Sequence, residues 1–447
     1  MKKGVLKCVI IFFLIYLVLP PSGAFPQTLC EREKKRKEIA DRMDKQNMLY
    51  SARVAVDTDA RMLEIPLNMK KHFGKEFTVA KTPPEIEFAI VPVEPRFLAV
   101  YNDQDNSGWW GNYCQSAYDS STGKFYSAVA DHGAYDAHIY LVEYDTSANK
   151  ISCPQEVNRA VGRTQDQFMD GILHGWLDIY QSGEHPRPHL WFCTYWSRFP
   201  EPVEEDYATG YDGGHIISYD MATGDFLDYG APVTRASWPY HRIDTQRGIM
   251  YAVGFYGEFL AWDINERKTR WAGYLPGDMQ WNNRAILLNR KSGMVYTTNA
   301  DESDKEHHMI KYDPFKNRFF KLSCHMPLNR ETGKYDAMRA QTRDSVHDGL
   351  FWGVTNTGTL FTFDPEKEEI ADKGLNWPGE NRYTCTMDRS PGGRYIYYQV
   401  QDYANGSPVI QYDTRTGMKK VLAFMLPYYY EKYGYVPTGS YSLKLDD

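Results

Sequence analysis

Short runs of alternating apolar and polar residues, separated by Gly, Asp and Asn, fill most of the chain after residue 76. A period of two with polar turns between the runs is typical of β-strands. The clearest strands are predicted at residues 125–130, 190–194, 250–253, 294–298, 350–354 and 395–400. No long stretch with helical periodicity follows about residue 60. The pattern therefore predicts an all-β fold.

An aromatic residue followed by Asp recurs at the end of six of these short runs. The pairs are Tyr144-Asp145, Tyr219-Asp220, Trp262-Asp263, Tyr312-Asp313, Phe363-Asp364 and Tyr412-Asp413. Successive pairs are 75, 43, 50, 51 and 49 residues apart, and the long interval contains two loop-like segments, 155–170 and 199–213. A step of about 50 residues fits one four-stranded blade of a β-propeller. Because the pairs recur in every copy, we expect them to close turns.

Closure of the ring is predicted from the two ends of the chain. Six complete copies run from residue 112 to residue 424. Residues 439–445 resemble the first strand of another blade, and residues 77–81, 87–92 and 96–102 would supply its other strands. Pairing of the N- and C-terminal strands would remove open sheet edges. We therefore expect a single propeller of seven four-stranded blades over residues 76–447. Six or eight blades are alternatives, and a two-domain β-sandwich leaves the constant step unexplained.

The N-terminus has the features of an export signal. Lys2 and Lys3 precede an apolar run at residues 5–19, which Pro20 and Pro21 end, and Ala24 is a suitable cleavage position. Residues 1–24 are thus predicted to be a signal peptide of a secreted or periplasmic protein, with an uncleaved membrane anchor as the alternative. Residues 25–75 form a highly charged segment that we expect to be partly helical, at 31–48, or irregular.

Charge and composition narrow the partners. The formal net charge is −7, which argues against nucleic acid, whose binding proteins are usually basic. Beyond the signal, no segment reaches membrane-spanning length. Aromatic residues make up 15% of the chain, and Tyr and Trp suit both half-buried strands and wet binding faces. A run of tyrosines at residues 425–435 is predicted to be a loop that offers such faces to a sugar.

Propeller topology places two kinds of position around one mouth of the central channel. These are the starts of the innermost strands and the connections between second and third strands, and such concave mouths bind ligands. The residues predicted there are His132, His138, His174, His241, Arg198, Arg242, Arg284, Arg339, Trp196, Tyr256 and Asn283. Arg offers a planar fork that matches a carboxylate, and His transfers protons near neutral pH. Any one of these histidines alone is more simply a structural residue, so the prediction of an anion site rests on their convergence.

The repeat region from about residue 88 onward resembles the propeller-type polysaccharide lyases, namely ulvan, oligogalacturonate and rhamnosyl-glucuronate lyases. The resemblance lies in architecture and composition. It implies cleavage of a uronate-containing glycan by β-elimination, with His174 and His241 as acid and base and Tyr256 as an alternate base. It also implies that Arg242, Arg284 and Arg339 hold the substrate carboxylate, whose developing negative charge they would stabilise.

A metal requirement and the type of activity stay open. Some propellers of this kind hold a divalent metal (Ca, Mn or Zn) through inner histidines, and His174 and His241 are the candidates here, although two His make a small ligand set. A glycoside hydrolase on the same substrate class is an alternative, but its usual paired carboxylates are not evident. A non-catalytic propeller that binds a glycan or a protein is the other alternative. A metal-dependent lactonase or quinone-dependent dehydrogenase would need more acidic ligands.

Overall fold

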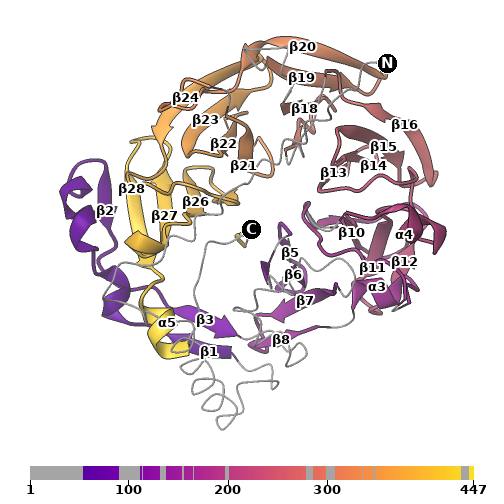
Figure 1. The fold of residues 1–447 in the computed structure, drawn as a ribbon. Helices are drawn as coiled ribbons and strands as arrows, with labels where there is room; N and C mark the ends of the chain where they lie inside the picture. The colour runs from indigo at the N-terminus through magenta and orange to yellow at the C-terminus, as the bar shows by residue number, and fades with distance from the viewer. Residues whose placement is uncertain are drawn as a thin grey trace, which may run out of the picture.

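The protein is a β-propeller, as the all-β pattern predicted (Figure 1). The computed structural model describes residues 54–89, 111–112, 114–130, 137–153, 156–164, 166–196, 201–277, 285–298, 308–334, 336–345, 348–433 and 442–446. The predicted signal peptide, the predicted helix at 31–48 and the predicted strand at 96–102 lie outside these residues. Within them, six sheets of mainly antiparallel strands surround a common axis and form the blades.

The blades follow one another in chain order, with the first strand of each blade innermost. Blade 1 contains β4 (Gly111–Asn112), β5 (Ala117–Asp119), β6 (Lys124–Ala130), β7 (Ile139–Asp145) and β8 (Lys150–Ser152). Blade 2 contains β9 (Asp178–Tyr180), β10 (His189–Cys193), β11 (Ile216–Asp220) and β12 (Phe226–Asp228). Blade 3 contains β13 (Tyr240–Asp244), β14 (Ile249–Val253), β15 (Glu258–Asp263) and β16 (Lys268–Tyr274). All six predicted second strands are present, with bounds shifted by at most a residue or two.

The remaining blades repeat this order. Blade 4 contains β17 (Leu287–Leu288), β18 (Val295–Thr298), β19 (His308–Asp313) and β20 (Arg318–His325). Blade 5 contains β21 (Met338–Gln341), β22 (Phe351–Thr355), β23 (Thr359–Asp364) and β24 (Glu369–Leu375). Blade 6 contains β25 (Met387–Arg389), β26 (Tyr395–Gln399), β27 (Pro408–Asp413) and β28 (Lys419–Phe424). The described α-helices are short: α3 (Val157–Ala160), α4 (Glu204–Ala208) and α5 (Tyr428–Tyr433).

The predicted number of blades, seven, is wrong, and the strand predicted to pair with residues 439–445 has another partner. The propeller has six blades, and β2 (Phe77–Val79) instead pairs in parallel with β28 as a fifth, outermost strand of blade 6. β1 (Val54–Asp57) and β3 (Ile86–Ala89) form a separate two-stranded sheet, which Figure 1 places between blade 6 and blade 1. An alternating pattern predicts an extended segment, but it does not specify the segment's partner.

The described C-terminal residues, 442–446, form no strand and bridge blades 1 and 6 through side chains. The Ser116 N–H donates to the Ser442 hydroxyl oxygen at 2.9 Å. The Leu445 N–H donates to Asp388 Oδ2, in β25, at 2.8 Å. The Lys444 ammonium lies 3.5 Å from the same carboxylate oxygen. The C-terminal segment thus contacts the innermost part of the first and last blades without joining either sheet.

The aromatic-Asp pairs close turns, as predicted. The carboxylate of the Asp accepts a backbone N–H from two or three residues further on; Asp145, for example, accepts from Ser147 at 2.9 Å and Ala148 at 3.0 Å. The fourth residue after the Asp has a positive φ in all six turns. These residues are Asn149 (49°), Gly224 (80°), Arg267 (53°), Asn317 (49°), Glu368 (56°) and Gly417 (73°). The tyrosine hydroxyl of the pair donates to Asn149 in blade 1 and to Asn317 in blade 4.

Replacing Gly224 tests this turn. Gly224→Asn is expected to leave the free energy of unfolding within about 0.5 kcal/mol of wild type, because Asn tolerates the left-handed region. Asn is also the native residue in two sister turns. Gly224→Val is expected to cost about 1–2 kcal/mol from backbone strain alone. Only the Tyr219 hydroxyl, at 3.7 Å, lies near the new Cβ. Denaturant unfolding of both variants measures the difference, and equal stabilities would contradict a strained turn.

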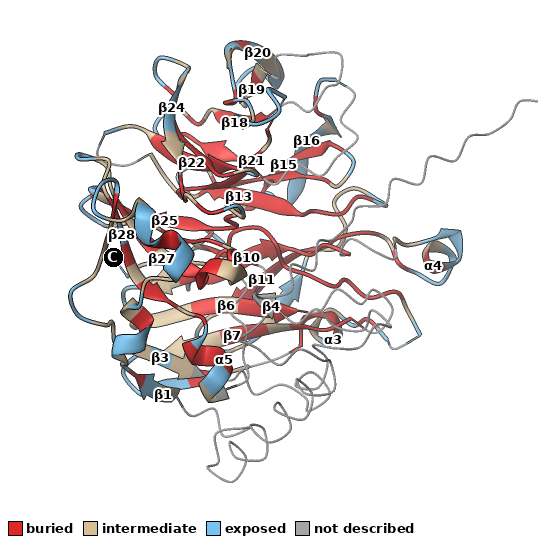
Figure 2. Ribbon diagram, turned by 60° about the vertical axis from the view of Figure 1, so that its left-hand side comes forward, coloured by how far each residue is buried: buried red, intermediate tan, exposed pale blue. Residues whose placement is uncertain are grey.

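Apolar side chains of neighbouring blades pack together between the sheets. One core cluster joins blades 1 and 2 through residues such as Leu141 and Leu190, and another joins blades 5 and 6. Figure 2 shows buried residues concentrated along the inner strands and exposed residues at the outer turns. The predicted tyrosine loop at 425–435 is corrected here: Tyr428, Tyr429 and Tyr430 belong to α5 and are buried, so they offer no exposed faces.

Candidate functional site

A narrow cavity lies where innermost strands of five blades begin. Its lining comprises Gln115 from blade 1, His174 from the segment before β9, Tyr240 from blade 3, Arg339, Ala340 and Gln341 from blade 5, and Cys385 and Thr386 from the segment before β25. We call this end of the channel the start mouth. The cavity is too narrow to admit a sphere the size of water. The predicted convergence of strand starts therefore includes two of the predicted residues, His174 and Arg339.

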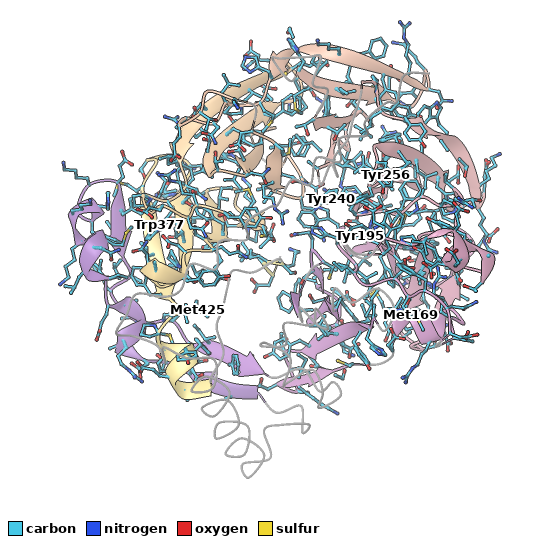
Figure 3. The ribbon with its side chains drawn as sticks, in the orientation of Figure 1. Met169, Tyr195, Tyr240, Tyr256, Trp377 and Met425 are labelled. Atoms are coloured by element: carbon cyan, nitrogen blue, oxygen red, sulfur yellow. The ribbon has the colours of Figure 1, made fainter. Side chains whose placement is uncertain are left out.

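The Tyr240 hydroxyl is the best-defined polar group of the cavity. The Trp176 indole N–H and the Gln341 side-chain amide both donate to its oxygen. An oxygen that accepts two hydrogen bonds still has its own O–H to donate. Burial raises the pKa of Tyr240 above its ordinary value, so the proton is retained. Figure 3 shows Tyr240 nearer to the centre of the ring than Tyr256. Tyr240 thus presents a hydrogen-bond donor.

Arg339 is held beside this cavity by an aromatic partner. Its guanidinium Nε donates to the Tyr383 hydroxyl, and the guanidinium carbon lies 4.9 Å from the centre of the Tyr383 ring. The Arg339 side chain is almost completely buried. A guanidinium stacked on an aromatic ring keeps its charge while its direction is fixed. Arg339 is therefore a preorganised cation at the start mouth.

Tyr240, Gln341, Gln115 and Tyr383 were not predicted as site residues. The sequence did contain a signal for Tyr240. Successive side chains of a strand point to opposite faces, so Tyr240 and Arg242 share one face and His241 takes the other. Alternation does not apply at Arg339, because the pairing of β21 with β22 shifts register between Met338 and Ala340, and Arg339, Ala340 and Gln341 all line the cavity. All of these residues lie near the start of an innermost strand, so their position in the repeat does not distinguish them. Within β13, the alternation of side chains between the two faces of the strand does.

His241 does not line the cavity. Its imidazole packs against Gly175 and is completely buried. Burial lowers the pKa of His241 to about 4, so the ring is neutral at neutral pH. A neutral, enclosed imidazole in contact with backbone has the surroundings of a packing residue.

Arg242 belongs to a buried charge network further along the channel. Its guanidinium lies 3.5 Å from a carboxylate oxygen of Asp178 and 3.5 Å from one of Asp344. Arg343 and Arg290 also face Asp178, at 3.5 and 3.9 Å. Arg242 and Arg343 both lie against the Trp176 ring, at 4.9 and 4.6 Å from its centre. Three guanidinium groups and two carboxylates thus form one charge network beside Trp176.

The other predicted residues with described positions also lie away from the cavity. Trp196 is buried, with its ring 5.5 Å from that of Phe255. The Tyr256 hydroxyl donates to the Glu201 carboxylate, and burial together with this hydrogen bond raises the pKa of Tyr256. His138 is buried and stacks on Tyr140 at 6.1 Å. His132, Arg198, Asn283 and Arg284 lie outside the described residues.

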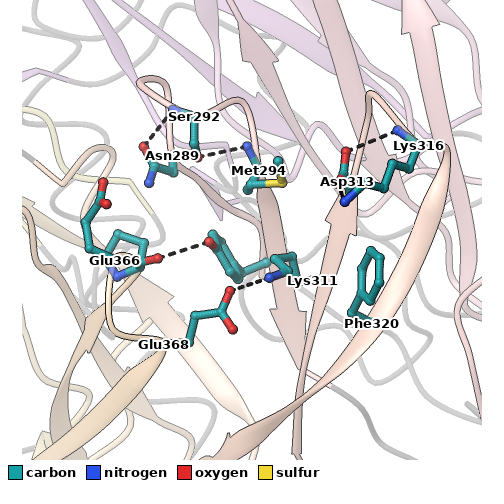
Figure 4. A pocket seen from close by; sticks show the side chains of 11 residues that line it. Asn289, Ser292, Met294, Lys311, Asp313, Lys316, Phe320, Glu366 and Glu368 are labelled. Atoms are coloured by element: carbon teal, nitrogen blue, oxygen red, sulfur yellow. Dashed lines mark hydrogen bonds and ion pairs between the residues drawn. The ribbon is translucent and has the colours of Figure 1, made fainter.

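A larger cavity of about 340 Å³ lies at the turns of blades 4 and 5 (Figure 4). Its charged groups are paired: the Lys311 ammonium lies 2.5 Å from Glu368, the Lys316 ammonium lies 3.2 Å from Asp313, and Glu366 lies 3.4 Å from Lys291 outside the lining. The Tyr296 hydroxyl on its wall donates to the Pro365 carbonyl oxygen at 3.2 Å. This cavity contains none of the predicted site residues, and its charges are already neutralised. The start mouth remains the candidate site.

The described part of the chain contains neither a metal-ligand cluster nor a membrane-spanning helix. Among its residues, no three or more His, Cys, Asp or Glu side chains are grouped so as to hold a metal ion. His174 and His241, the predicted metal pair, differ in surroundings, since only His174 lines the cavity. No helix in the same residues is long and apolar enough to cross a membrane.

The six-bladed ring defines the chain as a β-propeller protein. No family model matches the sequence, and no curated protein matches it. Among solved structures, the chain is similar to Sqt1 from Saccharomyces cerevisiae, with a TM-score of 0.43 and 11% sequence identity. The similarity covers 68% of this chain and 72% of that chain. A likeness at this identity concerns the fold and carries nothing about function.

Proposed function

We propose that this protein is a carbohydrate-active enzyme that binds a uronate-containing glycan at the start mouth and cleaves it by β-elimination. The observation that supports the proposal is the convergence of His174, Tyr240 and Arg339, from three different blades, on one cavity. Together they offer an imidazole, a hydroxyl donor and a cation. A polymeric glycan is an extracellular substrate, which agrees with the export signal predicted at residues 1–24.

Each group has a role in this reaction. The Arg339 guanidinium neutralises the carboxylate of the sugar, which makes the proton on C5 removable. His174 accepts that proton, the electron pair forms the C4–C5 double bond, and the bond from C4 to the glycosidic oxygen breaks. The Tyr240 hydroxyl donates its proton to the departing oxygen. Because the cavity does not admit a sphere the size of water, its lining side chains must move apart before a sugar carboxylate can bind.

The test is an activity screen of the purified protein on a panel of uronate polysaccharides, measured by the ultraviolet absorbance of unsaturated products. On a substrate that is cleaved, His174→Ala and Tyr240→Phe are each expected to lower kcat by about 10²–10⁴-fold, the usual contribution of general acid–base catalysis. His185→Gln is the matched control, because His185 bonds the Tyr229 hydroxyl and does not line the cavity. Full activity of both His174→Ala and Tyr240→Phe would refute the proposed roles of His174 as base and Tyr240 as acid.

Other outcomes of the same screen identify the alternatives. Release of reducing ends without ultraviolet absorbance would indicate a glycoside hydrolase. Saturable glycan binding without any product would indicate a binding propeller. In either case the lyase proposal fails. Loss of glycan binding in Arg339→Ala would still locate the ligand at the start mouth.

A further inference from the structure

His215, at the start of β11, lies between two carboxylates. Its Nδ1 is 2.8 Å from Asp228 Oδ1 and 2.9 Å from Asp228 Oδ2, and its Nε2 is 2.7 Å from Asp212 Oδ1. The residue is nearly buried, at 9% exposure. A neutral imidazole has one N–H, whereas an imidazolium has two. Only the protonated ring can donate to both carboxylates at these distances.

Asp212 and Asp228 come from different parts of blade 2. Asp228 ends β12, the outer strand of the blade, whereas Asp212 belongs to residues 201–214, which we call the lobe. The lobe contains α4, and Figure 2 shows α4 projecting from the ring. The bridge through His215 therefore connects the lobe to the body of the blade.

The other charged groups around His215 are few and can be named. Arg163, which follows α3, lies 3.6 Å from Asp212 and 3.3 Å from the buried Asp170. Asp170 also accepts hydrogen bonds from Thr194 and from Tyr211 of the lobe, each at 2.8 Å. The positive charge of Arg163 opposes protonation of His215, and the charges of Asp212 and Asp228 favour it. His215 contacts two carboxylates directly, whereas the charge of Arg163 is partly neutralised by Asp170. The net effect favours the protonated form of His215.

We propose that His215 is a proton-controlled clamp that holds the lobe against blade 2 when protonated and releases it when neutral. Loss of the proton leaves one carboxylate, Asp212 or Asp228, facing a nitrogen lone pair. Asp212 is the one that gives way, because its side chain is 49% exposed and can turn to water, whereas that of Asp228 is 27% exposed.

The direction of the pH dependence follows from the environment of the ring. Burial alone would lower the pKa of His215, but the hydrogen bonds to Asp228 and Asp212 outweigh it and raise the pKa above the ordinary value of about 6.5. A group with a raised pKa in the folded protein stabilises it fully below the ordinary pKa, and the stabilisation is lost as pH rises through the folded pKa. The lobe is therefore clamped below the ordinary histidine pKa and released as pH rises through the raised pKa of His215.

The His215 clamp does not depend on the proposed enzymatic activity. However, the lobe that it holds contacts Tyr256, one of the residues predicted at the channel mouth. The lobe carries Glu201, whose carboxylate accepts the Tyr256 hydroxyl of blade 3. It also carries Glu204, which pairs with Arg235 at 2.6 Å. Tyr211 bonds the buried Asp170 at 2.8 Å, and Arg163 donates to the Gly213 carbonyl oxygen at 3.0 Å. These buried contacts remain when Asp212 is released, so the change is confined to the segment around Asp212 and the exposed pairs, which contribute little.

Hydrogen exchange followed by mass spectrometry tests the clamp on the full chain. After correction for the intrinsic pH dependence, exchange of peptides from residues 201–214 is expected to rise about tenfold between pH 6 and pH 9, the effect of losing one charge-assisted hydrogen bond. In His215→Gln the exchange should be high at both pH values. The control variant His185→Gln should follow the wild type, because no carboxylate bonds its ring.

A second measurement keeps the test valid if His215→Gln does not fold. Asp212→Asn retains the Asp228 contact and is expected to lower the pKa of His215, read from its imidazole signals in NMR. The proposal is overturned if wild-type exchange in the lobe is independent of pH. It is equally overturned if His215 titrates at or below the ordinary histidine value.

Discussion

Replacing Gly175 with alanine is expected to lower the free energy of unfolding by about 3 kcal/mol, the upper range for overpacking a core. A Cβ at this position would meet the imidazole of His241, with Cγ only 2.8 Å away and two further ring atoms closer still. The ring cannot retreat, because His241 is completely buried in β13. Denaturant unfolding, monitored by tryptophan fluorescence, measures the loss.

Gly183→Ala is the matched control, since no atom lies within 4 Å of a Cβ built at that turn glycine. Its stability should stay within about 0.5 kcal/mol of wild type. In the double variant, His241→Ala should recover part of the loss caused by Gly175→Ala, because it removes the ring that the new methyl group meets. Equal stability of the two glycine variants would show that the ring moves without cost.

The contact between Gly175 and His241 joins two blades, and contacts of this kind could not be predicted from the sequence. The positions of the strand starts could be predicted. The repeat of aromatic-Asp pairs is local: each Asp bonds the backbone within its own turn, so the sequence contains the whole motif. The repeat predicted the blade order and the positions at which innermost strands begin, including His174 and Arg339. Alternation groups side chains by face, but which face points to the channel, and which side chain it meets from the next blade, depend on long-range packing.

The predicted partner of residues 77–81, a seventh-blade strand at 439–445, was wrong for the same reason. Residues 77–79 do form a strand, but the open edge of β28 accepts them in parallel, with Phe77 opposite Lys419. Phe77 also packs edge-on against Trp377, at 5.4 Å between ring centres. These partners lie in the last two blades, far from Phe77 in sequence, so no local pattern could have selected them over a strand from the C-terminus.

Among the single substitutions, we expect one in the charge network beside Trp176, Asp178→Asn, to lower the free energy of unfolding most. Asp178→Asn keeps the shape of the side chain and removes its charge, which leaves Arg242 and Arg343 in a buried site without that carboxylate. We expect a loss of about 3–5 kcal/mol in the free energy of unfolding, the usual result of breaking a buried ion pair. The Ile243 N–H donates to Asp178 at 2.8 Å, and the Asn oxygen can still accept it. The loss is therefore electrostatic.

The surface pair of Arg330 and Asp372 provides the control. The Arg330 guanidinium is 2.6 Å from Asp372, but the two side chains are 48% and 42% exposed. Asp372→Asn should therefore cost less than about 1 kcal/mol despite the shorter distance. If Asp178→Asn and Asp372→Asn lowered the free energy of unfolding by similar amounts, burial would not account for the contribution of Asp178.

The pH dependence distinguishes a charge effect from a packing effect at Asp178. Burial alone would raise the pKa of Asp178, but Arg242, Arg343 and Arg290 together lower it below its ordinary value. A lowered pKa gives stability that is present above the ordinary value of about 3.9 and is lost as pH falls through the folded pKa. The deficit of Asp178→Asn relative to wild type should thus be constant near neutrality and shrink below about pH 4. A deficit that persists unchanged in acid would mean that shape, and not charge, is what Asp178 contributes to the channel.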